Sequence, residues 1–432
     1  MNKQFNLTKG FILLKDGNIY DPFQSIEKQN DILIRDGKII EISKQIKLKS
    51  NYKVIDCSQF IITNGFIDLH AHFREPGFEF KENLITGSNS AFHGGFTRVC
   101  TMPNTNPVVD TPELVTYIID KSEDLPIYIY PIGAITKGQK GEELAEIGQM
   151  VNKGAVAISD DGIPVHNSQV MRFALEYAQQ FNIPVINHAE DCHLVNDGLI
   201  HEGDVSLKLG LSGNPDIAES SMVYRDLSIA EYVSGRLHVP HVSSYKSIET
   251  IKNFKEKGIN VTAEVTPHHL CFSDEILKNY DTNAKVAPPI RSIKDQRALI
   301  DAVKTGIIDC IATDHAPHAI EDKEKDFKNA ACGMIGMESA FALVNTTLRK
   351  EKMDIKDIIN LFTIKPSSIV DITPDLICEG SNAEINIIDP KFKWKFSLQD
   401  IYSKSKNTPV IGMDLIGKII YTINKGYISN KK

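Results

Sequence analysis

A pair of histidines and an arginine fall within one short stretch, Gly65 to Gly77, which reads G-F-I-D-L-H-A-H-F-R-E-P-G. The apolar residues at its start predict a short buried strand. Because alternate residues of a strand point to the same face, we expect His70, His72 and Arg74 to share one face. Two imidazoles on one face can hold a metal ion between them. We therefore interpret the pair as metal ligands rather than as core histidines that satisfy backbone groups.

Further nitrogen and oxygen donors come directly after apolar runs downstream. They are Asp161 in S-D-D-G, His188 in N-H-A-E, His241 in H-V-P-H-V and Asp314 in A-T-D-H. Asp161 is preferred over Asp160, and His241 over His238, because each lies nearer the end of its predicted strand. Histidine nitrogens combined with carboxylate oxygens are a donor set that zinc prefers. With the first two histidines, these residues predict a zinc site.

A zinc site of this kind predicts hydrolytic chemistry. Bound zinc lowers the pKa of water and polarises a carbonyl group. A neighbouring carboxylate can carry the proton to a leaving nitrogen, and Asp314 is the candidate for that role. Arg74, Asn104 and His318 lie just past the predicted ligands and carry hydrogen-bond donors. These donors suit an anionic substrate, because arginine can grip a carboxylate in a bidentate fork; the alternative for Arg74 is a surface ion pair with a nearby glutamate.

The elements that must position these residues alternate between strand and helix. After the strand that carries His70, the strand candidates are 97–102, 127–135, 155–159, 184–188, 237–242, 261–265 and 309–313. Helical patterns separate them, as at 112–121, 168–180, 220–233, 247–257 and 294–305. Eight alternating units predict a (β/α)8 TIM-like barrel, an α/β fold in which reactive residues gather at the carboxyl ends of the strands. A doubly wound open sheet is the alternative, and the lack of a glycine-rich phosphate loop after any strand counts against it.

Short strands flank the barrel on both sides. Within residues 11–62 they are separated by Asp16-Gly17 and Asp36-Gly37, which we interpret as hairpin turns. Strand patterns return at 384–388, 393–396 and 418–423. We therefore predict a small β domain assembled from residues 1–62 and 375–432, and a metal-dependent hydrolase barrel at 63–374. Residues 430–432 have the composition of a frayed tail.

The composition is that of a soluble globular protein, with 42% hydrophobic residues, 24% charged residues and a net charge of −8. No run of lysine and arginine is long enough for a nucleic-acid footprint. The seven cysteines are scattered without a C-x-x-C pair, which is typical of a reducing cytosol. Apolar stretches stay well short of the roughly 18 residues of a membrane span, and the N-terminus lacks a signal-peptide core. We expect a cytoplasmic protein that acts on a small molecule, without nucleic-acid or membrane partners.

Longer motifs around the candidate residues resemble those of the dihydroorotases, within the amidohydrolase superfamily. They are D-L-H-A-H-F-R-E-P-G-F-E-F-K-E at 68–82, M-P-N-T-N-P at 102–107, S-D-D-G at 159–162, N-H-A-E-D at 187–191, V-T-A-E-V-T-P-H-H-L at 261–270, I-A-T-D-H-A-P-H at 311–318 and N-T-P-V-I-G at 407–412. The resemblance covers almost the whole chain. It implies a zinc-dependent barrel with a small composite β domain, which reversibly cyclises N-carbamoyl-L-aspartate to L-dihydroorotate in the de novo pyrimidine (UMP) pathway.

The resemblance also assigns roles to single residues. The implied metal ligands are His70, His72, Asp161, His188, His241 and Asp314, with Asp314 also the general acid and base. The implied substrate contacts are His72, Arg74, Asn104, His318, Cys332 and Gly333. Many relatives bridge two zinc ions with a carboxylated lysine at the end of the fourth barrel strand, where this chain reads A-I-S-D-D-G. The chain resembles the class with an aspartate there, which leaves one or two zinc ions open.

Two positions depart from the family pattern. Ala287, in K-V-A-P-P-I-R, stands where an asparagine amide usually helps to hold the substrate, and Cys332 stands where phenylalanine is common. Gly333 is retained, so we expect its backbone contact to the substrate ring to be kept. If polar groups of the site go unpaired because of these departures, the free energy of substrate binding weakens by on the order of a few kcal/mol.

Two other readings stay open from the sequence. Hydantoinases and allantoinases are related cyclic-amide hydrolases, but they generally carry the bridging lysine. A non-catalytic barrel that serves as a scaffold for aspartate transcarbamoylase is disfavoured because the full ligand set is present. An active enzyme could still form a homodimer or bind aspartate transcarbamoylase. The segment between His315 and Gly333, rich in charged residues, is a candidate cover for the site.

Overall fold

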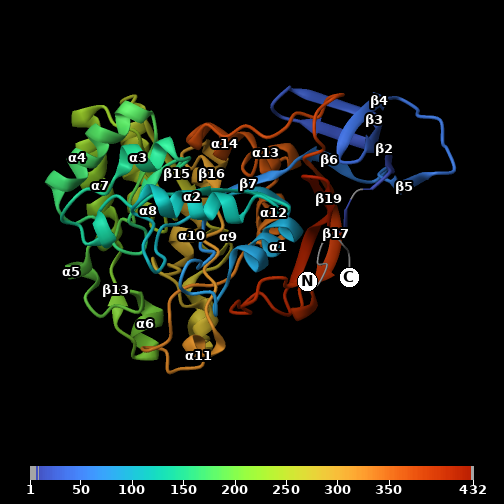
Figure 1. Cartoon of the computed structure of the whole chain (residues 1–432). Coiled ribbons are helices and arrows are strands. Elements are labelled where there is room, and N and C mark those ends of the chain that lie inside the picture. Colours follow the sequence, from blue (N-terminus) through green and yellow to red (C-terminus); the bar gives the residue numbers. More distant parts are fainter. Residues whose placement is uncertain (1–5, 8, 430–432) are drawn as a thin grey trace.

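The structure, a computed structural model, describes residues 6–7 and 9–429. The predicted frayed tail at 430–432 lies outside the described residues. Two parts are visible in Figure 1: a ring of strands wrapped by helices, and a β-sheet beside it that combines the two ends of the chain in blue and red. Within the described part of the chain, no helix is long and apolar enough to cross a membrane.

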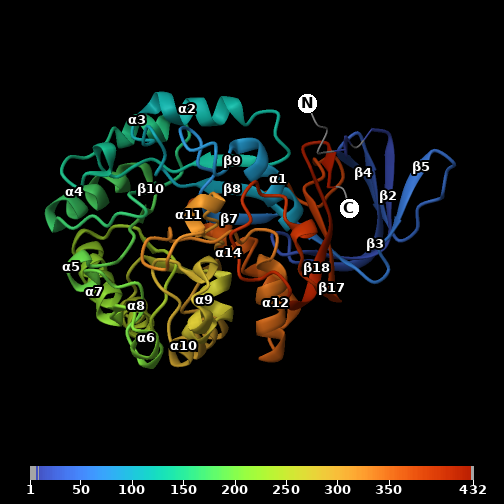
Figure 2. The same cartoon turned by 90° about the horizontal axis from the view of Figure 1, so that it is seen from below.

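Eight parallel strands form a closed barrel, as predicted. They are β7 (Phe66–Ala71), β8 (Phe96–Thr101), β9 (Tyr128–Pro131), β10 (Ile158–Ser159), β11 (Val185–Ile186), β14 (Leu237–Val239), β15 (Val261–Val265) and β16 (Cys310–Ile311). Regular ladders join β7 to β9 and β10 to β16. Single parallel bridges close the two gaps, Gly133 with Ile158 and Ala71 with His315. Figure 2 looks onto the end of this barrel, with the short helix α11 (Ile320–Lys323) near its centre.

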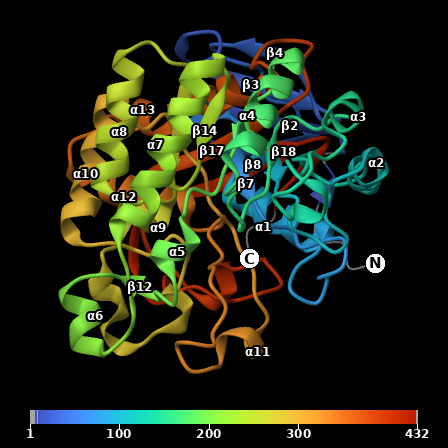
Figure 3. The ribbon, with the colours of Figure 1, turned by 90° about the vertical axis from the view of Figure 1, so that its left-hand side faces the viewer.

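Helices cover the outside of the barrel. The larger ones are α1 (Leu84–Gly94), α2 (Pro112–Lys121), α3 (Ile147–Asn152), α4 (Ser168–Ala178), α7 (Asp216–Val233), α8 (Tyr245–Glu256), α10 (Ile293–Thr305), α12 (Ala340–Lys350), α13 (Ile355–Asn360) and α14 (Ile364–Val370). Figure 3 shows α7, α8 and α10 side by side on one flank. Local sequence sets their ends: the Ser292 side chain accepts from Asp295 N at the start of α10, and Gly306 closes it with φ of 76°.

Shorter elements lie in the connections. The helical ones are α5 (Cys192–Val195), α6 (Asp204–Leu209), α9 (Pro267–Cys271) and 3₁₀ turns at Lys137–Gln139, Gln179–Phe181, Asp274–Asn279, Thr282–Ala284 and Leu398–Asp400. The strands β12 (Ile200–His201) and β13 (Gly213–Asn214) pair with each other. Since α5, α6 and α11 follow barrel strands, these connections cover the carboxyl end of the barrel (Figure 1).

Strands from both ends of the chain form one nine-stranded sheet, in the order β1-β19-β18-β17-β6-β2-β3-β4, with β5 paired to β2. Its members are β1 (Asn6–Leu7), β2 (Phe11–Asp21), β3 (Ile26–Arg35), β4 (Lys38–Ser43), β5 (Tyr52–Asp56), β6 (Ile61–Asn64), β17 (Ile385–Lys395), β18 (Asp414–Asn424) and β19 (Tyr427–Ile428). The two ends meet where β6 pairs antiparallel with β17, from Asn64 opposite Ile385 to Ile61 opposite Ile388. The predicted boundary at residue 62 falls inside β6, which runs from Ile61 to Asn64. The division into domains stays a prediction.

One of the two predicted hairpin turns is wrong. Asp36-Gly37 does turn the chain, since Arg35 pairs with Lys38. Asp16-Gly17 instead lies inside the continuous strand β2, where the register with β3 shifts between Leu14 and Gly17. Asp16 has φ of 56°, and its N–H donates to Asp31 Oδ1 at 2.8 Å. This is a β-bulge, which uses the same residue types as a tight turn without reversing the chain.

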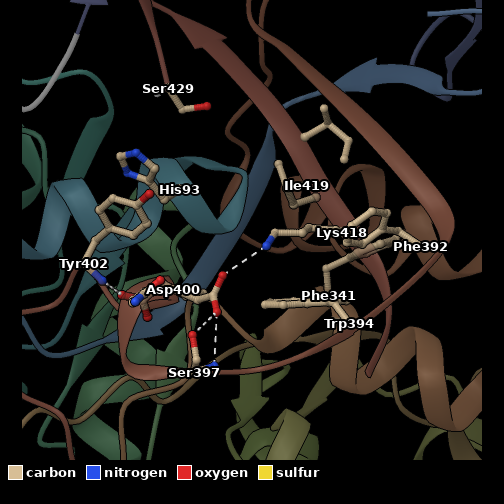
Figure 4. A pocket seen from close by; sticks show the side chains of 14 residues that line it. His93, Phe341, Phe392, Trp394, Ser397, Asp400, Tyr402, Lys418, Ile419 and Ser429 are labelled. Carbon is tan, nitrogen blue, oxygen red and sulfur yellow. Dashed lines mark hydrogen bonds and ion pairs between the residues drawn. The ribbon is translucent and has the colours of Figure 1, made fainter. Parts of the chain in front are cut away.

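The sheet packs against the barrel around a cavity of about 300 Å³, drawn in Figure 4. Lys418 Nζ on β18 lies 3.0 Å from Asp400 Oδ1 and 3.9 Å from the centre of the Trp394 ring. The His93 ring of α1 stacks on Tyr402, with centroids 3.5 Å apart. From this contact the chain continues through residues 403–407 back towards the carboxyl end of the barrel, where the backbone N–H of Lys404 donates to the buried carboxylate of Glu82 at 3.2 Å.

Candidate active site

The predicted histidine pair lies at the end of β7, with both rings buried. His70 Nε2 is 3.3 Å from Asp161 Oδ1 and 3.7 Å from Asp314 Oδ1. His72 Nε2 is 3.1 Å from Asp314 Oδ1 and 3.5 Å from Asp161 Oδ2. The two imidazole nitrogens therefore face the same two carboxylates, although those carboxylates come from distant parts of the chain.

The other two predicted histidines also approach Asp161, at the same oxygen as His70. His241 Nε2 is 3.5 Å and His188 Nδ1 is 3.8 Å from Asp161 Oδ1. His188 Nδ1 and His241 Nε2 are 3.0 Å apart. Two overlapping groups of donors, each within 4.8 Å, result: one contains His70, His72 and Asp314, the other His70, Asp161 and His241.

This arrangement fits a cation. His70 Nε2 and Asp161 Oδ1 are buried, and neither has a hydrogen-bond partner among the described residues. Buried polar atoms without partners are costly and are rare unless a ligand or ion satisfies them. Nitrogen and oxygen donors that converge on an otherwise unsatisfied point are what a metal such as zinc requires.

Three hydrogen bonds fix which ring nitrogen each imidazole turns inward. His70 Nδ1 is 2.9 Å from Glu264 Oε1, His72 Nδ1 is 2.9 Å from Asn104 Oδ1, and His188 Nε2 is 3.0 Å from Glu190 Oε2. Because a carboxylate or amide oxygen only accepts, the bonded nitrogen must carry the proton. The other nitrogen of each ring is left with its lone pair toward the candidate metal position.

Glu264 and Glu190 were not predicted as site residues. Burial raises the pKa of both carboxyl groups. The histidines that they contact have the larger, opposite effect, so that the pKa of each carboxyl group falls to about 2. Glu264 also accepts from His238 Nε2 at 3.0 Å, so it joins two histidines. For Glu264 the sequence does contain a signal, because it is an acidic residue inside the predicted buried strand 261–265. Buried acids are almost always paired, so a partner inside the barrel could have been expected.

The structure also separates the members of each ambiguous pair. Asp160 accepts from the backbone N–H groups of Ile135 and Thr136 and from the Thr136 hydroxyl, so it braces the loop after β9. His238 turns toward Glu264 and Thr262. Asp161 and His241 are the members that face the candidate metal position. Their role as ligands stays a prediction.

Three of the predicted site residues have backbone angles that non-glycine residues rarely adopt. Arg74, His241 and Asp314 have φ of 62°, 34° and 46°. Such conformations cost about 1–3 kcal/mol each and persist where the surrounding structure holds them. Strand periodicity predicts that Arg74 shares the face of His70 and His72. This prediction is wrong in detail, because β7 ends at Ala71 and the backbone of Arg74 is left-handed.

A cavity of about 220 Å³ opens beside the donors. All the predicted site residues except His70 line it: His72, Arg74, Asn104, Asp161, His188, His241, Asp314, His318, Cys332 and Gly333. Ala287, which departs from the resembled pattern, lines it as well. The ligand and substrate positions proposed from the sequence thus share one space, at the carboxyl end of the barrel.

Arg74 brings a positive charge to the same cavity. The Arg74 guanidinium donates to Pro317 O at 3.2 Å, and its Nη2 is 3.3 Å from His318 Nε2. Burial lowers the pKa of Arg74 to about 10, so the group stays charged at neutral pH. Burial and the charge of Arg74 lower the pKa of His318 to about 3, which leaves this imidazole neutral. A partly buried guanidinium beside a neutral imidazole is a site for an anionic group.

Gly333 contributes shape rather than a free hydrogen-bonding group. Its N–H donates to Lys285 O at 2.9 Å, and its carbonyl accepts from Lys323 Nζ at 3.0 Å and from Asn407 Nδ2 at 3.1 Å. A Cβ at this position would lie 2.8 Å from Ala316 Cβ. The neighbouring thiol of Cys332 is exposed. The predicted backbone contact of Gly333 to a substrate ring remains a prediction.

Comparisons with known proteins agree with this site. A family model described as dihydro-orotase-like matches residues 59–247. A dihydroorotase of Citrifermentans bemidjiense is 41% identical over 418 residues, which cover 96% of this chain and 99% of the relative. A dihydroorotase of Caldicellulosiruptor saccharolyticus is 44% identical over 423 residues, covering 97% of this chain and 98% of the relative. The chain belongs to the dihydroorotase family. It is therefore an enzyme of the cyclic-amide hydrolase class.

Solved structures support the fold of this dihydroorotase family member. An L-hydantoinase (dihydropyrimidinase) from Arthrobacter aurescens matches with a TM-score of 0.85 at 22% identity, covering 98% of this chain and 96% of that one. A dihydropyrimidinase from Brevibacillus agri matches with a TM-score of 0.81 at 21% identity, covering 97% and 94%. The barrel and the appended sheet therefore follow a known architecture.

Proposed function

We propose that this chain is a zinc-dependent dihydroorotase that reversibly cyclises N-carbamoyl-L-aspartate to L-dihydroorotate in de novo pyrimidine biosynthesis. The observation that carries the proposal is the shared cavity, which is lined both by a partly buried guanidinium and by convergent histidine and aspartate donors. Relatives named dihydroorotase, about 40% identical over nearly the whole chain, support the choice of substrate.

The residues that would hold one or two zinc ions are His70, His72, Asp161, His188, His241 and Asp314. Asp161 is suited to serve two positions, because its Oδ1 faces His70 and His241 while its Oδ2 faces His72. Zinc bound there would lower the pKa of a water molecule and polarise the carbonyl under attack. Glu264, Glu190 and Asn104 orient the ligand imidazoles through their outer nitrogens.

Asp314 is proposed to move the proton. In the hydrolytic direction, water oxygen bonds to the ring acyl carbon, the bond from that carbon to the ring nitrogen breaks, and a proton from water reaches this nitrogen through Asp314 Oδ. In the cyclising direction the same carboxylate takes the proton from the attacking ureido nitrogen as the nitrogen–carbon bond forms, and it passes this proton to the carboxyl oxygen, which leaves as water. Its neighbours make it available as a base: although burial raises the pKa of the carboxyl, His72 and His70 lower it well below the usual range.

Substrate binding is assigned to the cavity residues around Arg74. Arg74 would grip the substrate carboxylate in a bidentate fork, with Asn104 and His318 beside it and His72, Cys332 and Gly333 closing the space. Asn104 Oδ1 is already engaged by His72, and its Nδ2 donates to Asp161 O at 3.3 Å, which leaves the second Nδ2 hydrogen for the substrate. Ala287 offers no polar side-chain atom, so this enzyme must hold the ring without an amide at that position.

The test is an assay of the zinc-replete protein with L-dihydroorotate, followed by ultraviolet absorbance, beside hydantoin and allantoin. Turnover of L-dihydroorotate, with much slower turnover of the other two, is the expected result. Zinc-loaded protein that hydrolyses hydantoin or allantoin but not L-dihydroorotate would refute the substrate assignment.

A further inference from the structure

The side chain of Asn407 joins two stretches that line the candidate active site. It is 4% exposed, and it belongs to the segment that returns from the β-sheet to the barrel. Asn407 Oδ1 accepts from His318 N at 3.1 Å, while Nδ2 donates to Ala316 O at 3.0 Å and to Gly333 O at 3.1 Å. All three bonds go to the backbone of cavity-lining residues, whereas Asn407 itself does not line the cavity.

The stretch around Gly333 is otherwise held by two buried lysines. Lys323 Nζ donates to Gly333 O at 3.0 Å and to Ala331 O at 2.7 Å. Lys285 Nζ donates to Phe327 O at 2.8 Å, Lys328 O at 3.0 Å and Ala330 O at 2.8 Å. These ammonium groups fix the loop internally, but they do not connect it to His318. The two backbones also meet directly, where the Ala316 N–H donates to Met334 O at 2.9 Å. Asn407 adds a side-chain connection that reaches from Gly333 O to Ala316 O and His318 N.

Close contact between the two stretches makes their alignment matter. A Cβ at Gly333 would lie 2.8 Å from Ala316 Cβ and 3.0 Å from His318 Nε2, so the two backbones already touch. His318 in turn lies against the Arg74 guanidinium. Displacement of either stretch by about 1 Å would change the wall against which the anionic group of a substrate must fit.

We propose that Asn407 is a positioning residue for substrate binding, which aligns the His318 and Gly333 stretches by hydrogen-bonding the backbone of both. Its effect on substrate rests on the proposed function, whereas its effect on the two stretches does not. The competing explanation is that Asn407 only stabilises the fold, as a buried asparagine commonly does.

The informative variant is Asn407→Asp, which keeps the acceptor for His318 N and replaces the donor to Ala316 O and Gly333 O. A matched control is Asn345→Asp. Asn345 is fully buried, and its Nδ2 also donates to two carbonyls, Pro390 O at 3.1 Å and Ile416 O at 2.7 Å. Those bonds join α12 to the β-sheet, away from the cavity lining. Asn407→Ser, which is shorter and uncharged, replaces Asn407→Asp if that variant does not fold.

The measurements are hydrogen exchange by mass spectrometry, steady-state kinetics with L-dihydroorotate, and zinc content, all on the full-length zinc-loaded protein. We expect Asn407→Asp to speed exchange in peptides covering 314–319 and 331–336 and to raise KM about tenfold, with kcat within about threefold and zinc content unchanged. Asn345→Asp is expected to lower thermal stability without either change.

Wild-type exchange in both stretches of Asn407→Asp, a wild-type KM, or equal changes in Asn345→Asp would each overturn the proposal. Failure of the unmodified protein to turn over L-dihydroorotate would overturn the proposed function instead. Exchange in the two stretches would then still decide whether Asn407 positions them.

Discussion

Hydrogen bonds to the ring nitrogen that faces away from the candidate metal position set the orientation of the His70, His72 and His188 imidazoles. Among these partners, Glu264 contacts two histidines, His70 at Nδ1 and His238 at Nε2, from a fully buried position. A carboxylate there makes the opposite nitrogen of His70 more basic and holds the ring at a fixed angle. Neutralising it should therefore loosen the metal without removing any ligand.

We predict that Glu264→Gln weakens metal binding about tenfold or more, while leaving all six proposed ligands in place. The measurement is the zinc dissociation constant from competition with a chelator of known affinity. Glu384→Gln is the matched control, because it is also a buried glutamate but lies outside the candidate site. Equal zinc affinity in the wild type and Glu264→Gln would remove this carboxylate from the ligand assembly.

Asp314→Asn is predicted to keep the fold and slow both directions of the reaction by about 10²–10⁴, because the amide cannot carry the proton. Initial rates from L-dihydroorotate and from N-carbamoyl-L-aspartate measure the effect, with circular dichroism to verify the fold. A rate close to wild type in either direction would show that another group moves the proton.

Arg74→Lys is predicted to raise the KM for L-dihydroorotate about tenfold, since a point charge cannot reproduce the two parallel bonds of the guanidinium. The loss should shrink for an analogue that lacks the carboxylate, which serves as the internal control. If KM for both compounds changed equally, Arg74 would be acting on the shape of the cavity instead of on the carboxylate.

At the residue scale, position along predicted strands was enough to choose the candidate donors but not their partners. Asp161 and His241 were chosen over their neighbours because they lie later in their strands, and the structure turns both toward the cavity. Glu264 was missed because it reaches His70, a residue 194 positions away, through the barrel interior. A contact of that kind depends on which strands become neighbours, and local sequence does not carry it.

At the scale of elements, long amphipathic helices were more predictable than strands and bulges. The predicted helix at 112–121 coincides with α2 (Pro112–Lys121), which has proline near its start. Some barrel strands were predicted longer than they are: 155–159 became Ile158–Ser159, which lacks the first three predicted residues, whereas 261–265 coincides with β15. The bulge at Asp16-Gly17 was mistaken for a turn, since both structures favour these residue types.

Gly17 tests the reading of this bulge. A Cβ at Gly17 would lie 2.2 Å from Ile62 Cδ1 on the adjacent strand β6. Gly17→Ala should therefore destabilise the protein by about 1–3 kcal/mol, measured by urea unfolding. Ile62→Val removes that methyl group, so Gly17→Ala should cost less in the Ile62→Val background. The same cost in both backgrounds would mean that the backbone, and not this contact, demands glycine.

At the scale of the whole molecule, a buried ion pair joins the barrel to the sheet. Arg98 on β8 donates through Nε and Nη2 to the two oxygens of Glu384, each at 2.9 Å. Glu384 also accepts from Thr97 Oγ1 at 2.7 Å and from Asp375 N at 2.8 Å. The carboxylate therefore connects the second barrel strand to the chain that enters β17.

Glu384→Gln is predicted to lower the free energy of unfolding by about 3 kcal/mol, because it leaves the Arg98 charge buried without its counter-charge. Urea unfolding measures the loss, and zinc affinity should stay at the wild-type value because the pair lies outside the candidate site. A loss below about 1 kcal/mol would indicate that water or a neighbouring group compensates Arg98.

The pairing of β6 with β17 has a consequence for biosynthesis. These two strands are roughly 320 residues apart in the chain. At about 5–20 residues per second, the ribosome needs roughly 15–60 s to produce β17 after β6 has been made. During that time the edge of β6 is an unpaired template for other strands. The nascent protein therefore depends on a chaperone or on early folding of the barrel to keep this edge from associating with other chains.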